Sequence, residues 1–439
     1  MKNAIKSFIK REYKDQETVI TAENLNDIQD AVIALEDGLF SIDNDKSGEV
    51  IAITDAAKRG LRSLNIYGKT TQNGTPTPDA PVDLVSVGED GNIKCGIYGK
   101  NLIEPKLENS TSNGMSITNN GDGSYTLNGT STGVATFRVN QTTNTSTDNL
   151  NSYCGTFTLS VRDDSGNLNP QGIEMILMET VNWAVSLRSA SLPTSTIDTE
   201  KAMVYMQVPD GLKLVNFIVY PQLEAGSIVT EYEPYKGQAL TISTPNGLPG
   251  IPVASGGNYT DANGQQWVCD EIDLARGVYV QRIGVKQFGD ATGWGAAFNI
   301  GDRVLNDRFR VALDEVPLPY VGMSNMHSTV ENWGVSEGSI GFSGSDNYVY
   351  ARFPGIASKE QLGGLFSITP LIIAYGKATP VETPLSEDEL AAYAALHTYK
   401  EHTTVSNDAG AWMDLEYAMD AKKYIDGLAL GTMHTATVE

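Results

Sequence analysis

The chain has 439 residues, more than one hydrophobic core usually supports, so its length predicts roughly two to four domains. Its 31 lysines and arginines stand against 54 aspartates and glutamates. This formal charge of −23 argues against a nucleic acid or an anionic membrane as the main partner. No apolar run approaches the roughly 18 residues of a membrane span, and the first ten residues lack the apolar core of a secretory signal.

The cysteines predict neither a disulfide framework nor a zinc site. The chain has 3 of them, Cys95, Cys154 and Cys269, far apart and without a CxxC spacing. We therefore expect buried free thiols.

Residues 1–62 are predicted to be a helical segment for docking and oligomerisation. Thr21 can cap a helix, and apolar residues then follow at alternating spacings of three and four, which makes a heptad seam: Leu25, Ile28, Val32, Leu35 and Leu39. A seam this short is marginal as an isolated helix, so we expect it to form between copies of the chain. The seam does not fix the number of copies; a homotrimer is the expected assembly. An amphipathic helix packed on its own chain is the alternative.

From about residue 63 the apolar period changes to two, which predicts strands separated by Gly, Asn, Asp and Pro turns. Examples are residues 157–161, 202–208 and 214–220, and a further β-rich stretch runs from about 238 to 375. No helices alternate with these strands, so we expect a mainly β fold of antiparallel sandwich modules. A capping box at Ser386 then opens a helix in a small α+β C-terminal region.

A proline-rich stretch, residues 73–91, lies between two copies of Tyr-Gly-Lys. Pro76, Pro78 and Pro81 fix the backbone and remove amide donors, so the stretch cannot be a central strand. Residues 82–87 are nevertheless too apolar for a free linker. We expect a stiff turn that feeds an edge strand.

Several phrases carry a resemblance when taken together: the stretch 63–82, Gly-Lys-Asn-Leu at 99–102, Pro-Gln-Leu-Glu-Ala-Gly-Ser at 221–227 with Tyr-Glu-Pro-Tyr at 232–235, Asn-Tyr-Thr-Asp-Ala-Asn-Gly at 258–264, and residues 387–396, 403–408 and 424–426. They resemble tail-associated minor structural and receptor-binding proteins, of the tail fibre or baseplate, from phages and prophages of Gram-positive bacteria. The resemblance covers most of residues 60–430 and specifies no chemistry. It implies a component of the virion tail, assembled in the cytoplasm of the host bacterium, often with a jelly roll resembling carbohydrate-binding modules.

The resemblance also suggests a division of the chain. Residues 101–237 would be the jelly roll, inserted into a β platform made of residues 63–100 and 238–380. Residues 1–62 would precede the platform, and residues 381–439 would form the C-terminal α+β region. A linear string of domains is the alternative.

We predict no enzymatic activity. The 4 histidines are scattered, and neither GxSxG nor HExxH occurs. A glycosidase needs only two carboxylates, which a chain this acidic could supply by accident. The densest acidic group, Asp270 to Asp273, is better read as a polar strand edge.

No cofactor is predicted, although oxygen-rich loops could hold a structural Ca²⁺ ion. Asp43, Asp45, Ser47 and Gly48 match the first half of an EF-hand loop, but Thr54 stands where a bidentate Glu is required. A second possibility lies in the loops of the predicted jelly roll, at Asp122, Asp163 and Asp164.

Exposed aromatic rings can stack on a sugar while neighbouring amides and carboxylates bind its hydroxyls. Trp183, Trp294 and Trp333 are candidates because each lies near polar or glycine-rich sequence. A core or interface position is the alternative for each. Trp267 and Trp412 lie in strand-like alternation and are predicted to be core.

These features together predict a non-enzymatic, homo-oligomeric phage tail component that binds a host-surface polysaccharide. Many weak contacts would be multiplied by copy number, so that avidity replaces affinity. Other tail or baseplate proteins are expected partners; nucleic acid and membrane insertion are not. The alternatives are a purely architectural tail protein and a cell-wall or capsule glycosidase.

Overall fold

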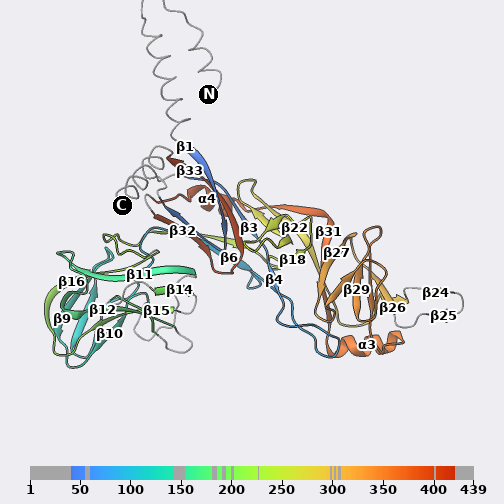
Figure 1. Cartoon of the computed structure of the whole chain (residues 1–439), viewed down its shortest axis with the longest axis horizontal. Helices are drawn as coiled ribbons and strands as arrows, with labels where there is room; N and C mark the ends of the chain where they lie inside the picture. The colour runs from blue at the N-terminus through green and yellow to red at the C-terminus, as the bar shows by residue number, and fades with distance from the viewer. Residues whose placement is uncertain are drawn as a thin grey trace, which may run out of the picture.

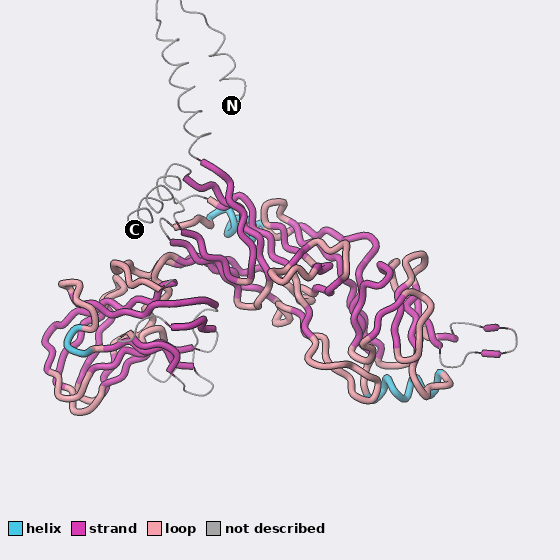
Figure 2. Tube along the Cα trace, viewed as in Figure 1, coloured by secondary structure: helices cyan, strands magenta, loops and turns pink. Residues whose placement is uncertain are grey.

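The computed structural model describes residues 41–54, 60–141, 154–179, 185–189, 194–198, 202–225, 227–296, 299–300, 303–304, 308–399 and 402–420. With 53% strand and 7% helix, the fold is mainly β, as predicted, and its sheets are antiparallel apart from one short parallel pair (Figures 1 and 2). The predicted helical seam of Leu25, Ile28, Val32, Leu35 and Leu39 lies outside the described residues. No described helix is long and apolar enough to cross a membrane.

Part of the segment predicted to be helical is instead β-structure. Strands β1 (Ser41–Gly48) and β2 (Val50–Thr54) each pair with a strand from the C-terminal part of the chain. In β2 the side chains of Ile51 and Ile53 are both buried, which is the period of two that a strand with one buried face requires. The helical prediction for residues 41–54 is therefore wrong.

The described residues between 101 and 225 form a sandwich of two sheets, which we call the sandwich (Figure 1). One sheet has the order β14 (Thr194–Asp198), β11 (Cys154–Asp163), β16 (Lys213–Ala225), β9 (Tyr125–Thr130), β8 (Met115–Asn119), β7 (Ser110–Ser112). The other has the order β10 (Ala135–Arg138), β15 (Ala202–Val208), β12 (Glu174–Glu179), β13 (Val185–Arg188), with a 3-10 turn at Pro170–Gly172. Alternate residues such as Met175 and Leu177 face a shared apolar core, so this unit buries its own interior.

Two central sheets adjoin the sandwich. The larger has the order β1, β33 (Trp412–Asp420), β3 (Leu61–Tyr67), β21 (Glu271–Asp273), β22 (Val278–Phe288), β31 (Leu371–Pro384), β27 (Pro317–Ser324). The smaller has the order β17 (Gly237–Ser243), β6 (Asn92–Tyr98), β32 (His402–Asn407), β2, and helix α4 (Glu387–Ala395) contacts β17. Leu64 and Met413 from one sheet share a core with Ile97 and Val405 from the other. Strands of the predicted C-terminal region thus lie inside both central sheets.

An outer lobe, residues 289–370, adjoins β27 and β31 at the end opposite the sandwich (Figure 1). Its sheet has the order β23 (Gly295–Ala296), β26 (Arg308–Ala312), β30 (Tyr348–Arg352), β29 (Ser339–Phe342), β28 (Thr329–Glu331). Helix α3 (Lys359–Ile368) buries Leu362 and Phe366 against this lobe and begins at Ser358, whose side chain accepts a hydrogen bond from the Gln361 amide.

Short sheets complete the described fold: β18 (Gly250–Val253), β20 (Gln266–Cys269) and β19 (Tyr259–Thr260); β4 (Thr70–Thr71) with β5 (Val85–Ser86); and β24 (Asn299–Ile300) with β25 (Arg303–Val304).

A buried asparagine closes the sandwich where the chain enters and leaves it. Asn101 is 2% exposed; its Nδ2 donates to the carbonyls of Pro221 and Glu233, each at 3.1 Å. Its Oδ1 accepts from the amides of Ile103 and Leu223. These contacts use the full hydrogen-bonding capacity of one amide side chain. Asn101 therefore ties the first residues of the sandwich to its last strand and to the segment that leaves it.

The motif Pro-Gln-Leu-Glu on β16 holds the same departing segment. Gln222 and Glu224 are each 1% exposed. The Gln222 Oε1 accepts from the Glu233 amide at 2.8 Å, and the Glu224 carboxylate accepts from the amide and hydroxyl of Thr230 at 3.0 and 2.6 Å. This motif, one of those that carry the resemblance, therefore fixes the backbone at Thr230 and Glu233.

The proline-rich stretch is a strap held at several points. Thr77 and Ala80 exchange backbone hydrogen bonds in a tight turn, and the Val82 amide donates to the Asn325 carbonyl at 2.9 Å. The Gln72 Nε2 donates to the carbonyls of Val82 and Ser324, each at 3.0 Å. The strap leads into β5, whose described strand partner is β4. It connects the central sheets to the base of the outer lobe.

Replacement of Asn101 by alanine is expected to lower the free energy of unfolding by about 2–4 kcal/mol, because backbone groups that stay buried would lose their partners. The urea midpoint, followed by tryptophan fluorescence, measures this. The exposed Asn92→Ala variant serves as the control and should shift the free energy by less than about 0.5 kcal/mol. An unchanged midpoint for Asn101→Ala would contradict the role assigned to this amide.

Candidate functional site

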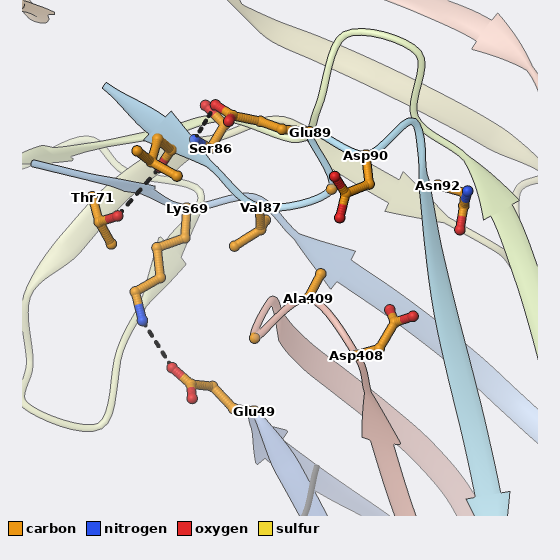
Figure 3. Close-up of a pocket in the computed structure, with 13 residues that line it drawn as sticks. Glu49, Lys69, Thr71, Ser86, Val87, Glu89, Asp90, Asn92, Asp408 and Ala409 are labelled. Carbon is orange, nitrogen blue, oxygen red and sulfur yellow. Dashed lines mark hydrogen bonds and ion pairs between the residues drawn. The ribbon is translucent and has the colours of Figure 1, made fainter. Parts of the chain in front are cut away.

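A pocket of about 530 Å³ opens at the edge of the central sheets (Figure 3). Its walls come from separate parts of the chain: the β1–β2 turn, strand β4, residues 85–92 and the β32–β33 turn at 408–410. The turn at 85–92 requires glycine at position 88. The φ of Gly88 is +71°, and a Cβ atom there would clash with the side chains of Thr244 and Ile93.

Lys69 occupies one side of the pocket in a fixed position. Its Nζ lies 2.9 Å from the Glu49 Oε1 and 5.0 Å from the centroid of the Trp412 ring. The ion pair is partly exposed and contributes little to stability by itself, but together with the cation–π contact it holds the ammonium in place. The pocket therefore has one positioned donor opposite its acidic wall.

The opposite side carries Glu89, Asp90, Asn92 and Asp408 (Figure 3). Glu89 accepts from the Ser86 amide at 2.6 Å, and Asp408 accepts from the Lys94 amide at 2.9 Å, so both fasten turns. Asp90 and Asn92 are exposed and make no side-chain hydrogen bond or ion pair within the described part of the chain. They are the groups that a ligand can use without breaking an existing contact.

The pocket is lined mainly by hydrogen-bond acceptors. Glu49, Glu89, Asp90 and Asp408 make it an acceptor-rich, negatively charged surface, with Lys69 and Asn92 as donors. Carboxylates and amides of this kind bind sugar hydroxyls, whereas phosphate groups would be repelled. Sequence reasoning missed the pocket because its residues span positions 49–410 and follow no periodic pattern.

An aromatic stack stiffens the wall behind Lys69. The rings of Tyr67 and Tyr259 lie 4.7 Å apart, those of Tyr259 and Trp412 lie 4.9 Å apart, and Trp267 meets Trp412 edge-on at 4.8 Å. Trp412 is buried and Trp267 is half-buried, in keeping with the core positions predicted for them. The stack is packing within the protein, with little ring surface left for a ligand.

The predicted tryptophan platforms have different outcomes. Trp183 lies outside the described residues. Trp294 is 2% exposed and packs against Phe288, Phe353 and Phe366 at ring distances of 5.2–6.3 Å, so no ring face is free for a sugar and this prediction is wrong. Trp333 is 54% exposed and stays a candidate. Neither Trp294 nor Trp333 lines the pocket of Figure 3.

The calcium loop predicted at Asp43 to Gly48 is a strand. All of these residues belong to β1, paired residue by residue with β33, and an extended backbone cannot curl around an ion as an EF-hand loop does. No group of three or more His, Cys, Asp or Glu side chains that could hold a metal occurs among the described residues. Cys95 and Cys269 are buried free thiols, as predicted; the side chain of Cys154 lies outside the description.

The other predicted calcium ligands already accept hydrogen bonds from within the chain. Asp122 accepts from the amide and hydroxyl of Ser124, and Asp163 accepts from the Ser165 and Asn167 amides. These hydrogen bonds, from the Ser124 hydroxyl and the Asn167 side chain above all, lower the pKa of both carboxyls. Asp164 accepts from the Tyr220 hydroxyl at 2.8 Å.

The prediction that Asp270 lies on a polar strand edge is wrong. Asp270 is 1% exposed, and its Oδ1 accepts from the amides of Arg282 and Ile283, each at 2.7 Å, at the β22 bulge. Its Oδ2 accepts from the Tyr279 hydroxyl at 2.8 Å. Burial raises the pKa of this carboxyl to about 6 against the effect of these donors. A second pocket, of about 490 Å³, touches Asp270, but this carboxylate is occupied in holding the bulge.

Comparison with known proteins identifies no relative. No protein-family model and no curated protein matches the sequence. A search of solved structures finds the crystal structure of the infectious bursal disease virus VP2 subviral particle, at 12% identity over 84% of this chain and 75% of that one. The TM-score of this match is 0.08, which is no evidence of a shared fold.

Trp294 and Trp333 should respond differently to replacement by alanine. Trp294→Ala is expected to lower the free energy of unfolding by about 3–5 kcal/mol, because it empties an aromatic core. Trp333→Ala, the control at an exposed position, should change it by less than about 0.5 kcal/mol. Chemical denaturation followed by circular dichroism measures both. Equal stability of the two variants would refute the core position of Trp294.

The outer lobe should lose stability in acid through His327. This side chain is 2% exposed and packs against Phe353, with the ring centroids 4.7 Å apart and the ring planes tilted by 57°. Neither ring nitrogen makes a hydrogen bond of ordinary geometry among the described residues. Burial lowers its pKa to about 4, with the Gly338 backbone opposing the shift. The unfolded chain, with a histidine pKa of about 6.5, then binds the proton more tightly than the folded one.

His327 therefore contributes stability that is fully present above about pH 6.5 and is lost, up to about 3 kcal/mol, as the pH falls towards 4. Asp270, whose pKa is raised, acts in the opposite direction over part of this range, so the comparison must be made against His327→Leu. Urea unfolding between pH 7.5 and 4 should show a shallower acid loss in that variant. Identical pH profiles would mean that His327 is not the titrating group.

Proposed function

We propose that this chain is a structural component of a phage tail, in a tail fibre, baseplate or tail tip, and that it takes part in adsorption to a host-surface glycan. The observation that carries the proposal is the pocket of Figure 3, where polar side chains from separate chain segments converge. Its volume of about 530 Å³ lies in the range of small-ligand sites. Asp90 and Asn92 supply uncommitted polar groups there.

The motifs that resemble tail proteins support a structural role. Asn101, Gln222 and Glu224 fix the course of the backbone around the sandwich. In the stretch 258–264, Asn258 bonds both backbone groups of Cys269, and Asp261 accepts from backbone amides and from Trp267. A protein that must hold its shape in a particle benefits from fixed connections of this kind.

The charge of the pocket favours a neutral glycan. Acceptor groups predominate in its lining, and the whole chain carries −23, so phosphate-bearing polymers are repelled at long range and at the site. A neutral polysaccharide offers hydroxyl donors without that cost. One shallow pocket gives weak affinity, which repeated copies in a tail multiply.

Combined replacement of Asp90 and Asn92 by alanine should reduce retention of the intact protein on host wall polysaccharide by about tenfold or more, the effect expected from losing more than one hydrogen bond. Asp210→Ala, on an exposed turn of the sandwich and outside the pocket, is the matched control and should bind as the parent does. Quantitative pull-down with neutral and with phosphate-bearing wall polymers measures both binding and selectivity.

The other readings give different results in the same experiment. Absence of binding by the intact protein to host cells would leave a purely architectural tail protein. Release of reducing sugar from the wall would indicate a glycosidase, in which case the second pocket, lined by Asp314 and Glu315, becomes the site to test.

A further inference from the structure

A turn at residues 244–249 lies between two pockets. The Thr244 hydroxyl donates to the Gly88 carbonyl at 2.8 Å, and Gly88 lines the pocket of Figure 3. Asn246, which is exposed, and Pro249, from the same turn, line the second pocket of about 490 Å³. The two pockets are therefore neighbours with one short segment between them.

The second pocket is built around Tyr375 on β31. The paired neighbours of Tyr375 on β22 and β27 are both glycines, Gly284 and Gly322. A Cβ atom at Gly284 would collide with the Tyr375 ring, so the ring lies over this glycine. The Tyr375 side chain is buried, and its hydroxyl donates to the Glu315 Oε1 at 2.9 Å. The sheet thereby fixes the position of the Glu315 carboxylate in the pocket lining.

Glu315 and Lys377 form a donor–acceptor pair in this lining. The Lys377 Nζ lies 3.4 Å from the Glu315 Oε1, and the Lys377 side chain is only 13% exposed. Within the described part of the chain, no hydrogen bond reaches the Glu315 Oε2, and Lys377 has no second ion-pair partner. An ammonium group only donates and a carboxylate only accepts. A ligand hydroxyl can therefore accept from Lys377 and donate to Glu315.

The charges beside this pair favour a neutral ligand. Lys286, which lines the pocket, lies 3.1 Å from Asp314, and Asp270 adds a further carboxylate to the lining. An anion would be repelled by the carboxylates, and a cation by the ammonium groups. Hydroxyl groups bind both kinds of side chain without that cost. Val285, which is 57% exposed, adds an apolar surface for the carbon face of a sugar ring.

We propose that the two pockets bind successive parts of one neutral oligosaccharide, which lies across the turn at 244–249. Asp90 and Asn92 offer hydrogen-bonding groups in one pocket, and Lys377 and Glu315 offer them in the other. Binding in one pocket raises the effective concentration of the same ligand at the other, so affinity increases with ligand length. The inference rests on the proposed glycan function and adds to it the length of the ligand.

The test is calorimetric titration of the intact protein with short and long fragments of the host's neutral wall polysaccharide, separated by size. The parent should bind long fragments at least about tenfold more tightly than short ones, with one long fragment for each chain. Lys377→Met removes the donors of a side chain of similar length and should reduce the affinity for long fragments about tenfold. Lys213→Met, the same change at an exposed lysine of the sandwich outside both pockets, should have no effect.

A second variant leaves the pair of Glu315 and Lys377 intact. Val285→Trp fills the second pocket from an exposed position, so it should reduce the affinity for long fragments as Lys377→Met does and leave the urea midpoint unchanged. Short fragments, which the pocket of Figure 3 still binds, should lose little affinity in either variant.

The possible failures are distinguishable. Affinity that is independent of fragment length and unchanged in both variants would overturn this inference and leave the pocket of Figure 3 as a glycan site. Two long fragments bound to each chain would also refute it, because the pockets would then be separate sites. If the parent binds no fragment at all, the proposed function fails, and this inference fails with it.

Discussion

The described fold depends on buried amide side chains that hydrogen-bond backbone groups where no neighbouring strand does so. A chain that passes repeatedly from one sheet to another leaves backbone donors and acceptors unpaired at each crossing, and burying them without partners is costly. Here amide side chains supply both a donor and an acceptor, as a neighbouring peptide group would. Asn258 bonds the amide and carbonyl of Cys269, Asn325 bonds the Ile372 amide and the Pro370 carbonyl, and Asn407 bonds the amide and carbonyl of Ala411.

The same constraint decides which polar groups are left for function. Five carboxylates that composition alone would suggest as functional groups each accept a hydrogen bond from a backbone amide: Glu89, Asp408, Asp122, Asp163 and Asp270. What remains uncommitted at the pocket of Figure 3 is Asp90 and Asn92, on a turn whose ends are already fixed. The candidate site is thus a rigid frame that offers a few free polar groups.

Local patterns predicted local structure well. The capping box could be predicted because both of its hydrogen bonds join Ser386 and Glu389. The alternation of Phe157, Leu159 and Val161 likewise predicted a strand whose apolar side chains face the core. Packing and pairing partners that are distant in sequence could not be predicted. Trp294 looked exposed among glycines, but its burial depends on Phe288, Phe353 and Phe366, which local composition cannot place. The Asp43 segment looked like a loop because its strand partner, β33, lies at the other end of the described chain.

This pairing between strands distant in sequence sets the order in which the parts of the protein can fold. The sandwich can close on its own core, and because Tyr98 and Gly237 are paired neighbours, it adds little strain to the sheet from which it departs. The central sheets, by contrast, cannot be completed until β32 and β33 reach β2, β3 and β6. Contacts of such sequence separation form slowly. The pairing of β1 with β33, which brings Ser41 and Asp420 together, therefore belongs to these late contacts.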